Sequence, residues 1–201
     1  MSRTGERVRS PKKREYIIRT MDKKWIEEFK IKYKNKKNND TTTKNDVKIY
    51  TDGCSKGNPG KGGYGIVMIY ENENGDIETK EIMQGYIRTT NNRMELMGPL
   101  VAFRELKKSC NIDFYSDSKY FVDAFNDNWV DKWLDNNFRM GRKTEVKNLD
   151  IWQDLLEEVI KHNITFHWVK GHDGDVYNER CDQLANESLN YDLIEDKNFV
   201  L

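Results

Sequence analysis

Four acidic residues lie in local contexts that suit metal-assisted chemistry. Asp52 and Asp117 each follow a short apolar run. Glu95 and Asp182 each lie two residues after an arginine. Carboxylate oxygens are the ligands that hard divalent cations take in proteins, and acids that share a site need such a cation because they repel one another. Since an acid taken at random is a solvated surface group, the residue types alone leave open whether the four converge.

The elements that must position these acids predict a mixed sheet. Alternating or apolar runs indicate strands at residues 47–52, 64–70, 79–86, 112–115 and 164–169. Helical spacing indicates helices at residues 91–108, 118–136, 149–162 and 179–190. The first three strands form an antiparallel meander, with a hairpin signal at Asn74-Gly75. The later strands alternate with helices, so the first and fourth strands run parallel.

This arrangement gives each acid an expected place. Asp52 and Asp117 lie at the carboxyl ends of neighbouring strands, where such sheets place their sites. Glu95 falls in the first turns of a helix, and Asp182 opens the last helix. Pro99 follows Glu95 within the same helix and removes an amide there, so we expect a kink.

Five segments, in order along the chain, resemble the motifs of one nuclease family. They are residues 49–60 (Ile-Tyr-Thr-Asp-Gly-Cys-Ser-Lys-Gly-Asn-Pro-Gly), 89–97 (Thr-Thr-Asn-Asn-Arg-Met-Glu-Leu-Met), 115–120 (Tyr-Ser-Asp-Ser-Lys-Tyr), 168–172 (Trp-Val-Lys-Gly-His) and 178–185 (Asn-Glu-Arg-Cys-Asp-Gln-Leu-Ala). Over about residues 47–190 the chain resembles the type 1 ribonucleases H. The resemblance implies an α/β fold, a ribonuclease H-like mixed five-stranded sheet with helices on both faces. It also implies an endonuclease that hydrolyses the RNA strand of RNA–DNA hybrids and leaves 5′-phosphate and 3′-hydroxyl ends.

The resemblance also assigns catalytic roles. It implies that Asp52, Glu95, Asp117 and Asp182 hold two Mg²⁺ ions, or Mn²⁺ in their place. Two such ions ~3.5–4 Å apart activate a water and steady the leaving oxygen of an in-line displacement. It further implies that His172 is an active-site histidine, and a titrating imidazole there shuttles protons or helps to release product.

Other matched positions are candidates for substrate contact. The 2′-hydroxyl distinguishes RNA from DNA, so short polar groups are expected on the RNA strand. The candidates for these contacts are Asn58, Asn91, Asn92 and the backbone near Cys54. Asn148 and Asn178 complete the polar candidates.

A segment of aromatic and basic residues resembles the protrusion with which bacterial relatives grip the DNA strand. Trp129 and Trp133 precede Arg139, Arg142 and Lys143, and basic groups among aromatics suit a phosphate backbone beside stacked sugars. Acidic residues nearby dilute the charge. The alternative is that the aromatics pack their helix onto the body.

The net charge of zero hides an asymmetry between the first 46 residues and the rest. Residues 1–46 hold 15 Lys/Arg and 7 Asp/Glu, and the remaining 19 and 27 lie in residues 47–201. We therefore expect three parts: a basic extension (1–46) with an amphipathic helix at 14–34 and a linker from residue 35, a catalytic domain (47–190) and a C-terminal tail (191–201). The extension either tethers the hybrid through its charge or docks on the body through Trp25 and Phe29.

Composition bounds the remaining expectations. No apolar run approaches the ~20 residues of a membrane span, and no signal-like stretch follows the N-terminus. We expect an intracellular protein, cytoplasmic or nuclear and not secreted, that acts as a monomer without an obligatory protein partner. Its three cysteines match no zinc spacing and are expected to be reduced thiols. Two alternative functions stay open: a catalytically silent hybrid-binding module, and another polynucleotidyl transferase on the same fold.

Overall fold

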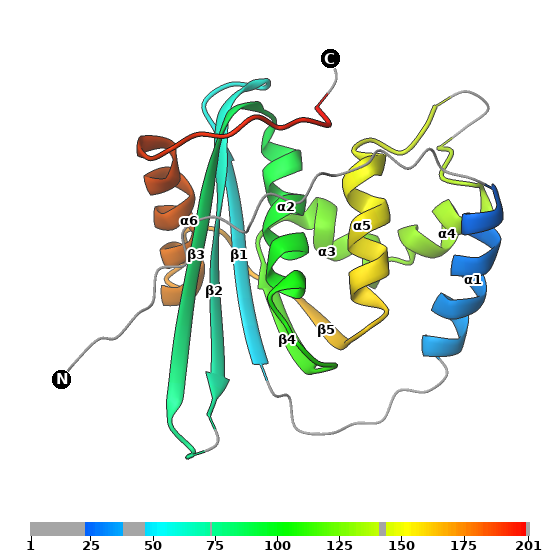
Figure 1. The fold of residues 1–201 in the computed structure, drawn as a ribbon, viewed down its shortest axis with the longest axis horizontal. Coiled ribbons are helices and arrows are strands. Elements are labelled where there is room, and N and C mark those ends of the chain that lie inside the picture. Colours follow the sequence, from blue (N-terminus) through cyan, green and yellow to red (C-terminus); the bar gives the residue numbers. More distant parts are fainter. Residues whose placement is uncertain (1–22, 38–46, 73, 141–143, 200–201) are drawn as a thin grey trace.

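The computed structural model describes residues 23–37, 47–72, 74–140 and 144–199 (Figure 1). The strands are β1 (Val47–Ser55), β2 (Gly60–Glu71), β3 (Ile77–Thr89), β4 (Asn111–Ser116) and β5 (Asn163–Trp168). The helices are α1 (Lys23–Lys37), α2 (Asn91–Arg104), α3 (Lys119–Asn126), α4 (Trp129–Asp135), α5 (Leu149–Val159) and α6 (Val176–Glu187), and a short 3-10 turn η1 (Ser188–Asn190) follows α6.

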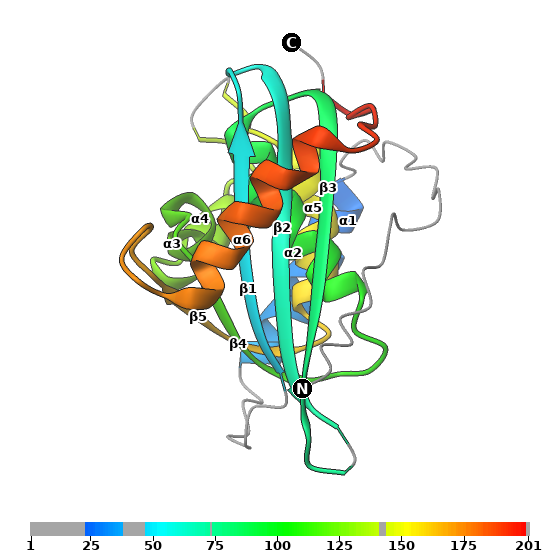
Figure 2. The same cartoon turned by 90° about the vertical axis from the view of Figure 1, so that its left-hand side faces the viewer.

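The five strands form one mixed sheet in the order β3-β2-β1-β4-β5. The β1–β2 and β2–β3 pairs are antiparallel, and the β1–β4 and β4–β5 pairs are parallel. Helix α6 lies across β1 and β2 on one face, and α2, α3 and α5 lie on the other (Figures 1 and 2). The predicted fold class is therefore confirmed, including the parallel first and fourth strands.

Two hydrophobic clusters hold helices on the two faces of the sheet. The larger one joins the sheet to α1–α5, with Phe103, Phe114 and Trp152 fully buried. The smaller one lies beneath α6 and includes Tyr50, Val67 and Leu184. At Gly65 of β2, an added Cβ would clash with the Cys181 carbonyl of α6. The missing side chain therefore lets α6 lie directly on the sheet.

Several predicted helix boundaries were wrong, and α5, for example, ends at Val159 rather than residue 162. Helix α2 ends at Arg104 rather than at residue 108. Directly after Arg104, the Leu106 N–H bonds to the Phe103 carbonyl in a tighter turn. The expected helix at 118–136 is two helices, because Asn128 between them adopts a left-handed backbone with φ 57°. The last helix begins at Val176 rather than residue 179, since Asp175 caps the amides of Tyr177 and Asn178.

Helix α1 packs into the main core. Phe29 is 1% exposed and Ile26 is 3% exposed, and the Trp25 indole donates a 2.7 Å hydrogen bond to Glu157 of α5. The expected helix at 14–34 thus continues to Lys37, beyond the predicted start of the linker, and its residues 14–22 lie outside the described part of the chain. The extension was expected either to tether the hybrid or to dock on the body, and for α1 these contacts favour docking on the body. Within the described ranges, no helix is both long and apolar enough to span a bilayer.

Candidate active site

The fold brings three of the four acids to one edge of the sheet from separate elements. The β1–β4 register ends at the pair Tyr50–Tyr115, so Asp52 and Asp117 lie two residues beyond it on neighbouring strands. Asp52 lies within β1, which continues to Ser55, and Asp117 directly follows β4. At Gly53, an added Cβ would lie 2.5 Å from the backbone nitrogen of Glu95. This close approach of β1 and α2 places Glu95 beside Asp52.

The fourth acid comes from α6. Asp182 lies in the middle of that helix rather than at its start, which corrects the sequence-based expectation. The close packing of α6 on β2 at Gly65 brings Asp182 to the same edge. Its carboxylate accepts a 2.9 Å bond from Asn186, whose oxygen accepts a 3.0 Å bond from Lys56. These two hydrogen bonds place the ammonium group of Lys56 near the acids.

The electrostatics show that the four acids face one another. The pKa of Asp52 is raised from 3.8 to about 8, first by burial and next by the charge of Asp117, with smaller contributions from Asp182 and Glu95. A 2.7 Å bond from the Gly53 amide opposes the shift only in part. Burial, followed by the charge of Asp182, also raises the pKa of Asp117, while a bond from the Asn178 side chain and the nearby His172 lower it. The site therefore gathers acids whose ionised forms are unfavourable unless a cation offsets their charge.

Glu95 is held by hydrogen bonds at both oxygens. Asn91 Nδ2 donates to Oε1 and Ser118 Oγ donates to Oε2, each over 2.7 Å. Burial raises the pKa of Glu95, and these two bonds lower it in part because they favour the charged form. The carboxylate is therefore oriented before any ligand arrives.

The donor set fits hard divalent cations. Asp52, Glu95, Asp117 and Asp182 supply carboxylate oxygens, the ligand type that Mg²⁺ prefers. The raised pKa values of Asp52, Glu95 and Asp117 mark a charge that a cation would offset. Among the described residues, no three acid, histidine or cysteine side chains are gathered closely enough to form a finished metal cage.

His172 lies in the loop before α6, near Asp117. Its side chain is exposed and its backbone is left-handed, with φ 54°. An added Cβ on the preceding Gly171 would lie 2.6 Å from Asp117 Oδ2, so this loop passes directly over the acid. The position of His172 is compatible with the expected proton transfer.

The candidates for RNA contact gather beside Glu95. The Asn58 side chain accepts a 3.2 Å bond from the Asn91 amide, which joins the loop after β1 to the first turn of α2. Asn92 is exposed in that turn, and Cys54 is half-buried two residues after Asp52. Asn178 is 3% exposed and its Oδ1 is a buried oxygen without a hydrogen-bond partner. Of these positions, Asn91 contacts Glu95 and Asn178 contacts Asp117.

The expected DNA-strand contacts come from elements farther from the sheet. Trp129 in α4 is half-buried, whereas Trp133 is 7% exposed and packs edge-on against Trp152. Trp133 therefore fits the alternative in which the aromatic residues pack their helix onto the body of the protein. Asn148 directly precedes α5, and its side chain bonds to Tyr120. Lys143 lies outside the described residues.

Three residues that border the acids were not identified from the sequence. Ser118 follows Asp117 and also caps α3 by accepting from the Phe121 amide, so its capping role could have been read from the sequence. Asn186 lies four residues after Asp182 on α6, a spacing that places side chains on one helix face. Lys56 has no local signal, because its partner Asn186 is 130 residues away.

Comparisons with known proteins identify the family of this chain. The family model described as RNase H matches residues 44–190. A ribonuclease H of Lachnoclostridium phytofermentans is 46% identical over 155 residues, which are 77% of this chain and 98% of that protein. A ribonuclease HI of a Synechocystis species is 45% identical over 144 residues, 72% of this chain and 88% of that protein. The crystal structure of LC9-RNase H1, a type 1 RNase H with the type 2 active-site motif, superposes with a TM-score of 0.66 at 29% identity, covering 75% of each chain. The chain therefore belongs to the type 1 ribonuclease H family of hydrolases.

Proposed function

We propose that this enzyme hydrolyses the RNA strand of RNA–DNA hybrids with two bound divalent cations, leaving 5′-phosphate and 3′-hydroxyl ends. The observation that carries the proposal is the convergence of four carboxylates from β1, α2, α6 and the end of β4, with the pKa of Asp52 raised to about 8 by burial and by its neighbours. Such charge is costly in a folded protein unless a cation offsets it. Family membership supports the same activity.

The chain's own residues organise the reaction. Asp52, Glu95, Asp117 and Asp182 would hold Mg²⁺ or Mn²⁺, and two such ions supply an activated water and offset charge on the leaving oxygen. Asn91 and Ser118 fix the orientation of the Glu95 carboxylate. The Asn178 amide holds Asp117 in the same way. Pre-oriented groups of this kind lower the reorganisation needed in the transition state.

His172 moves a proton in this scheme. It is exposed beside Asp117, in a loop whose Gly171 leaves room for the acid. An imidazole in this position accepts a proton from an attacking water or donates one to a departing oxygen. We assign this role to His172 because it is the one histidine of the described residues in the acid cluster; the remaining two are His162, buried in the core, and His167, paired with Asp113.

Recognition of RNA follows from the groups next to Glu95. Asn58, Asn91 and Asn92 offer short amide side chains, and these suit hydrogen bonds to 2′-hydroxyls across a wide, shallow groove. The backbone at Cys54 completes this surface, whereas the buried Asn178 side chain acts on Asp117. The DNA strand is gripped through Trp129, Asn148 and the basic segment containing Lys143, with phosphate contacts as the main source of affinity. One chain supplies all of these groups, which supports action as a monomer.

A cleavage assay with defined ends tests the proposal. Hybrids labelled at the 5′ end or at the 3′ end of the RNA are incubated with Mg²⁺ and with chelator. The 5′-labelled products are tested for a free 3′-hydroxyl, and the 3′-labelled products are offered to a ligase that needs a 5′-phosphate. The expected result is Mg²⁺-dependent cleavage of the RNA, with ligatable fragments that carry 3′-hydroxyls. Fragments with 3′-phosphates or cyclic phosphates would contradict the mechanism, and hybrid binding without cleavage would favour the silent module.

A further inference from the structure

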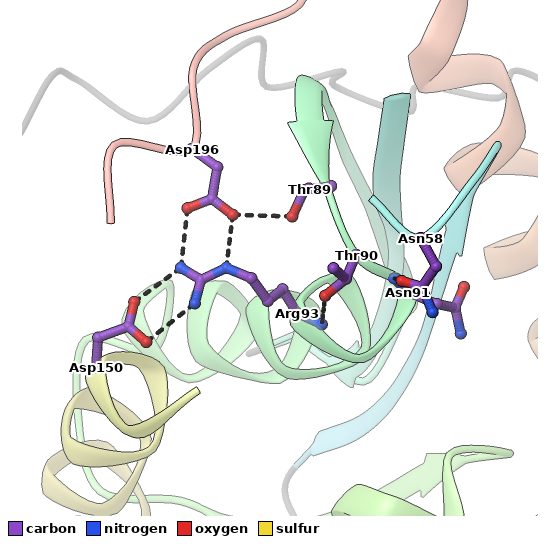
Figure 3. A network of polar contacts seen from close by, with 7 residues as sticks. All are labelled: Asn58, Thr89, Thr90, Asn91, Arg93, Asp150 and Asp196. Atoms are coloured by element: carbon purple, nitrogen blue, oxygen red, sulfur yellow. Dashed lines mark hydrogen bonds and ion pairs between the residues drawn. The ribbon is translucent and has the colours of Figure 1, made fainter. Parts of the chain in front are cut away.

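A buried arginine in the first turn of α2 is held by two carboxylates from distant parts of the chain. The Arg93 side chain is 4% exposed. Its Nε and one terminal nitrogen donate to Asp196 over 2.7 and 2.9 Å. Both terminal nitrogens donate to Asp150 of α5 over 3.0 and 2.7 Å (Figure 3). Bidentate pairs of this kind fix geometry as well as charge.

The two carboxylates are not equivalent. Asp196 also accepts a 2.8 Å bond from the hydroxyl of Thr89, the last residue of β3. Thr90, between Thr89 and the helix, caps α2, and its side chain accepts from the Arg93 amide. Asp196 therefore grips the chain on both sides of this cap (Figure 3), whereas Asp150 contacts Arg93 from α5. Release of Asp196 would loosen the junction of β3 and α2, and loss of Asp150 would leave that junction held.

The segment that carries Asp196 is itself fastened to the sheet. Ile194 forms a parallel bridge with Tyr86, with backbone bonds from Ile87 to Ile194 and from Ile194 to Gly85. Just before it, the buried Gln84 side chain donates to the Asp192 carbonyl. Residues 192–199 thus form a strap that runs from β3 to the start of α2. The side chain of Asp196, within this strap, is 5% exposed.

The turn gripped by this strap presents two residues of the active site. Asn91 is the first residue of α2, and its amide bonds to Asn58 in the loop after β1. Its side chain orients Glu95 one turn later. Arg93 lies between Asn91 and Glu95 in sequence, and its side chain is buried in the pairing with Asp196 and Asp150. The strap therefore contacts the same helical turn that carries both active-site residues.

We infer that Asp196 is a positioning residue of the C-terminal strap: through Arg93 and Thr89 it fixes the first turn of α2, so that Asn91 and Glu95 keep their orientation toward the hybrid and the cation. The inference deepens the proposed function and rests on it. Because Asp150 continues to pair with Arg93 when Asp196 is removed, the protein stays folded without the strap contact. The loss then appears as a loosened site rather than as unfolding.

The experiment compares Asp196→Ala with two matched variants in the full chain. Asp150→Ala removes the other partner of Arg93, and Glu195→Ala removes an exposed carboxylate of the same strap. Hydrogen exchange of residues 86–97 is measured without metal, and hybrid cleavage is measured well below each melting temperature across a range of Mg²⁺ concentrations. Asp196→Asn serves as a milder variant that keeps one acceptor oxygen.

The expected result separates Asp196 from both controls. In Asp196→Ala, amides of residues 86–97 should exchange about 10-fold faster, as expected for a local opening. Its kcat/KM should fall about 10-fold, which is a smaller loss than the roughly 100-fold decrease that a 1 Å misplacement causes. Half-maximal activity should also need a higher Mg²⁺ concentration. Asp196→Asn should lie between Asp196→Ala and the unchanged protein. Asp150→Ala should melt at a lower temperature with these values unchanged, and Glu195→Ala should change nothing.

One outcome would overturn the inference: Asp196→Ala melts at a lower temperature, but its hydrogen exchange, kcat/KM and Mg²⁺ dependence match those of Asp150→Ala. The contact between Asp196 and Arg93 would then be a purely structural ion pair. If the unaltered protein does not cleave hybrids, the proposed function fails. The exchange comparison in the metal-free protein then still decides whether the strap orders α2.

Discussion

Replacing Asp52 with asparagine should stabilise the metal-free protein while it abolishes cleavage. The Asp52 carboxylate lies half-buried among acids, and its pKa is raised from 3.8 to about 8. A group whose pKa is higher in the folded state than in the unfolded chain binds more protons when folded, so its contribution to stability is lost as pH rises. The loss begins near the ordinary pKa of 3.8 and is complete above about 8.

The size of the effect follows from this shift. One pKa unit corresponds to about 1.4 kcal/mol, so a rise of roughly four units sets an upper limit of about 6 kcal/mol at high pH. Asp52 is half-buried, and water and monovalent ions that enter the site screen part of the repulsion. We therefore expect Asp52→Asn to raise the free energy of unfolding by about 1–3 kcal/mol at pH 8.5, or about 3–8 °C in melting temperature for a chain of this size.

Thermal melting in chelator at pH 5 and pH 8.5 measures this difference. The gain from Asp52→Asn should shrink to a minor fraction at pH 5, where the native carboxyl is largely protonated. Asp76→Asn, which removes an exposed carboxylate from the hairpin turn, is the matched control and should show no such pH dependence. Added Mg²⁺ should stabilise the unaltered protein more than the variant, because binding to the folded state adds stability. An Asp52→Asn variant that melts at or below the unaltered protein at pH 8.5 would refute the electrostatic account.

Three further outcomes are expected. His172→Ala should lower kcat, since a proton shuttle contributes ~10²–10⁴-fold, with hybrid affinity unchanged; an unaltered kcat would remove His172 from the mechanism. Trp25→Ala should cost about 2–3 kcal/mol of stability, because it leaves a cavity beside Phe29 and removes the bond to Glu157, while Ile31→Ala on the exposed face of α1 should cost little; equal melting temperatures would contradict docking of α1. Deleting residues 1–22, which leaves α1 in place, should raise KM and flatten the salt dependence of hybrid binding by roughly 0.9 per lost phosphate contact, with kcat and melting temperature unchanged; identical salt slopes would exclude the tether.

The antiparallel meander and the parallel pairing of the first and fourth strands could be predicted because both leave local signals. Alternating residues such as Val47 and Ile49 mark a strand, and a helix between two strands dictates parallel pairing. The Asp52 and Asp117 motifs lie at strand ends that this topology brings together. The left-handed residue Asn128 has no comparable signal, so α3 and α4 were joined in the prediction.

The contacts that complete the site could not be predicted, because they join residues far apart in the chain. Asp196 reaches Arg93 across 103 residues, and an acid in a polar C-terminal tail has no feature that marks it as buried. The apolar face of α1 indicates that the helix packs on something, and the sequence left open whether this was the body. Trp133 shows the same difficulty, since an aromatic residue near basic ones suits both a core and a nucleic-acid surface.

The central claim is that the four-acid cluster cleaves RNA paired with DNA. The most direct test measures initial cleavage rates of one RNA sequence, supplied as a hybrid, as duplex RNA and as a single strand, together with labelled DNA in the hybrid. Each is incubated with Mg²⁺ or with chelator, for the unaltered protein and for Asp117→Asn. The account predicts that RNA in the hybrid is cut with Mg²⁺ by the unaltered protein alone, and that the DNA strand stays intact. Equal cleavage of duplex RNA, or turnover by Asp117→Asn at saturating Mg²⁺ that matches the unaltered protein, would contradict it.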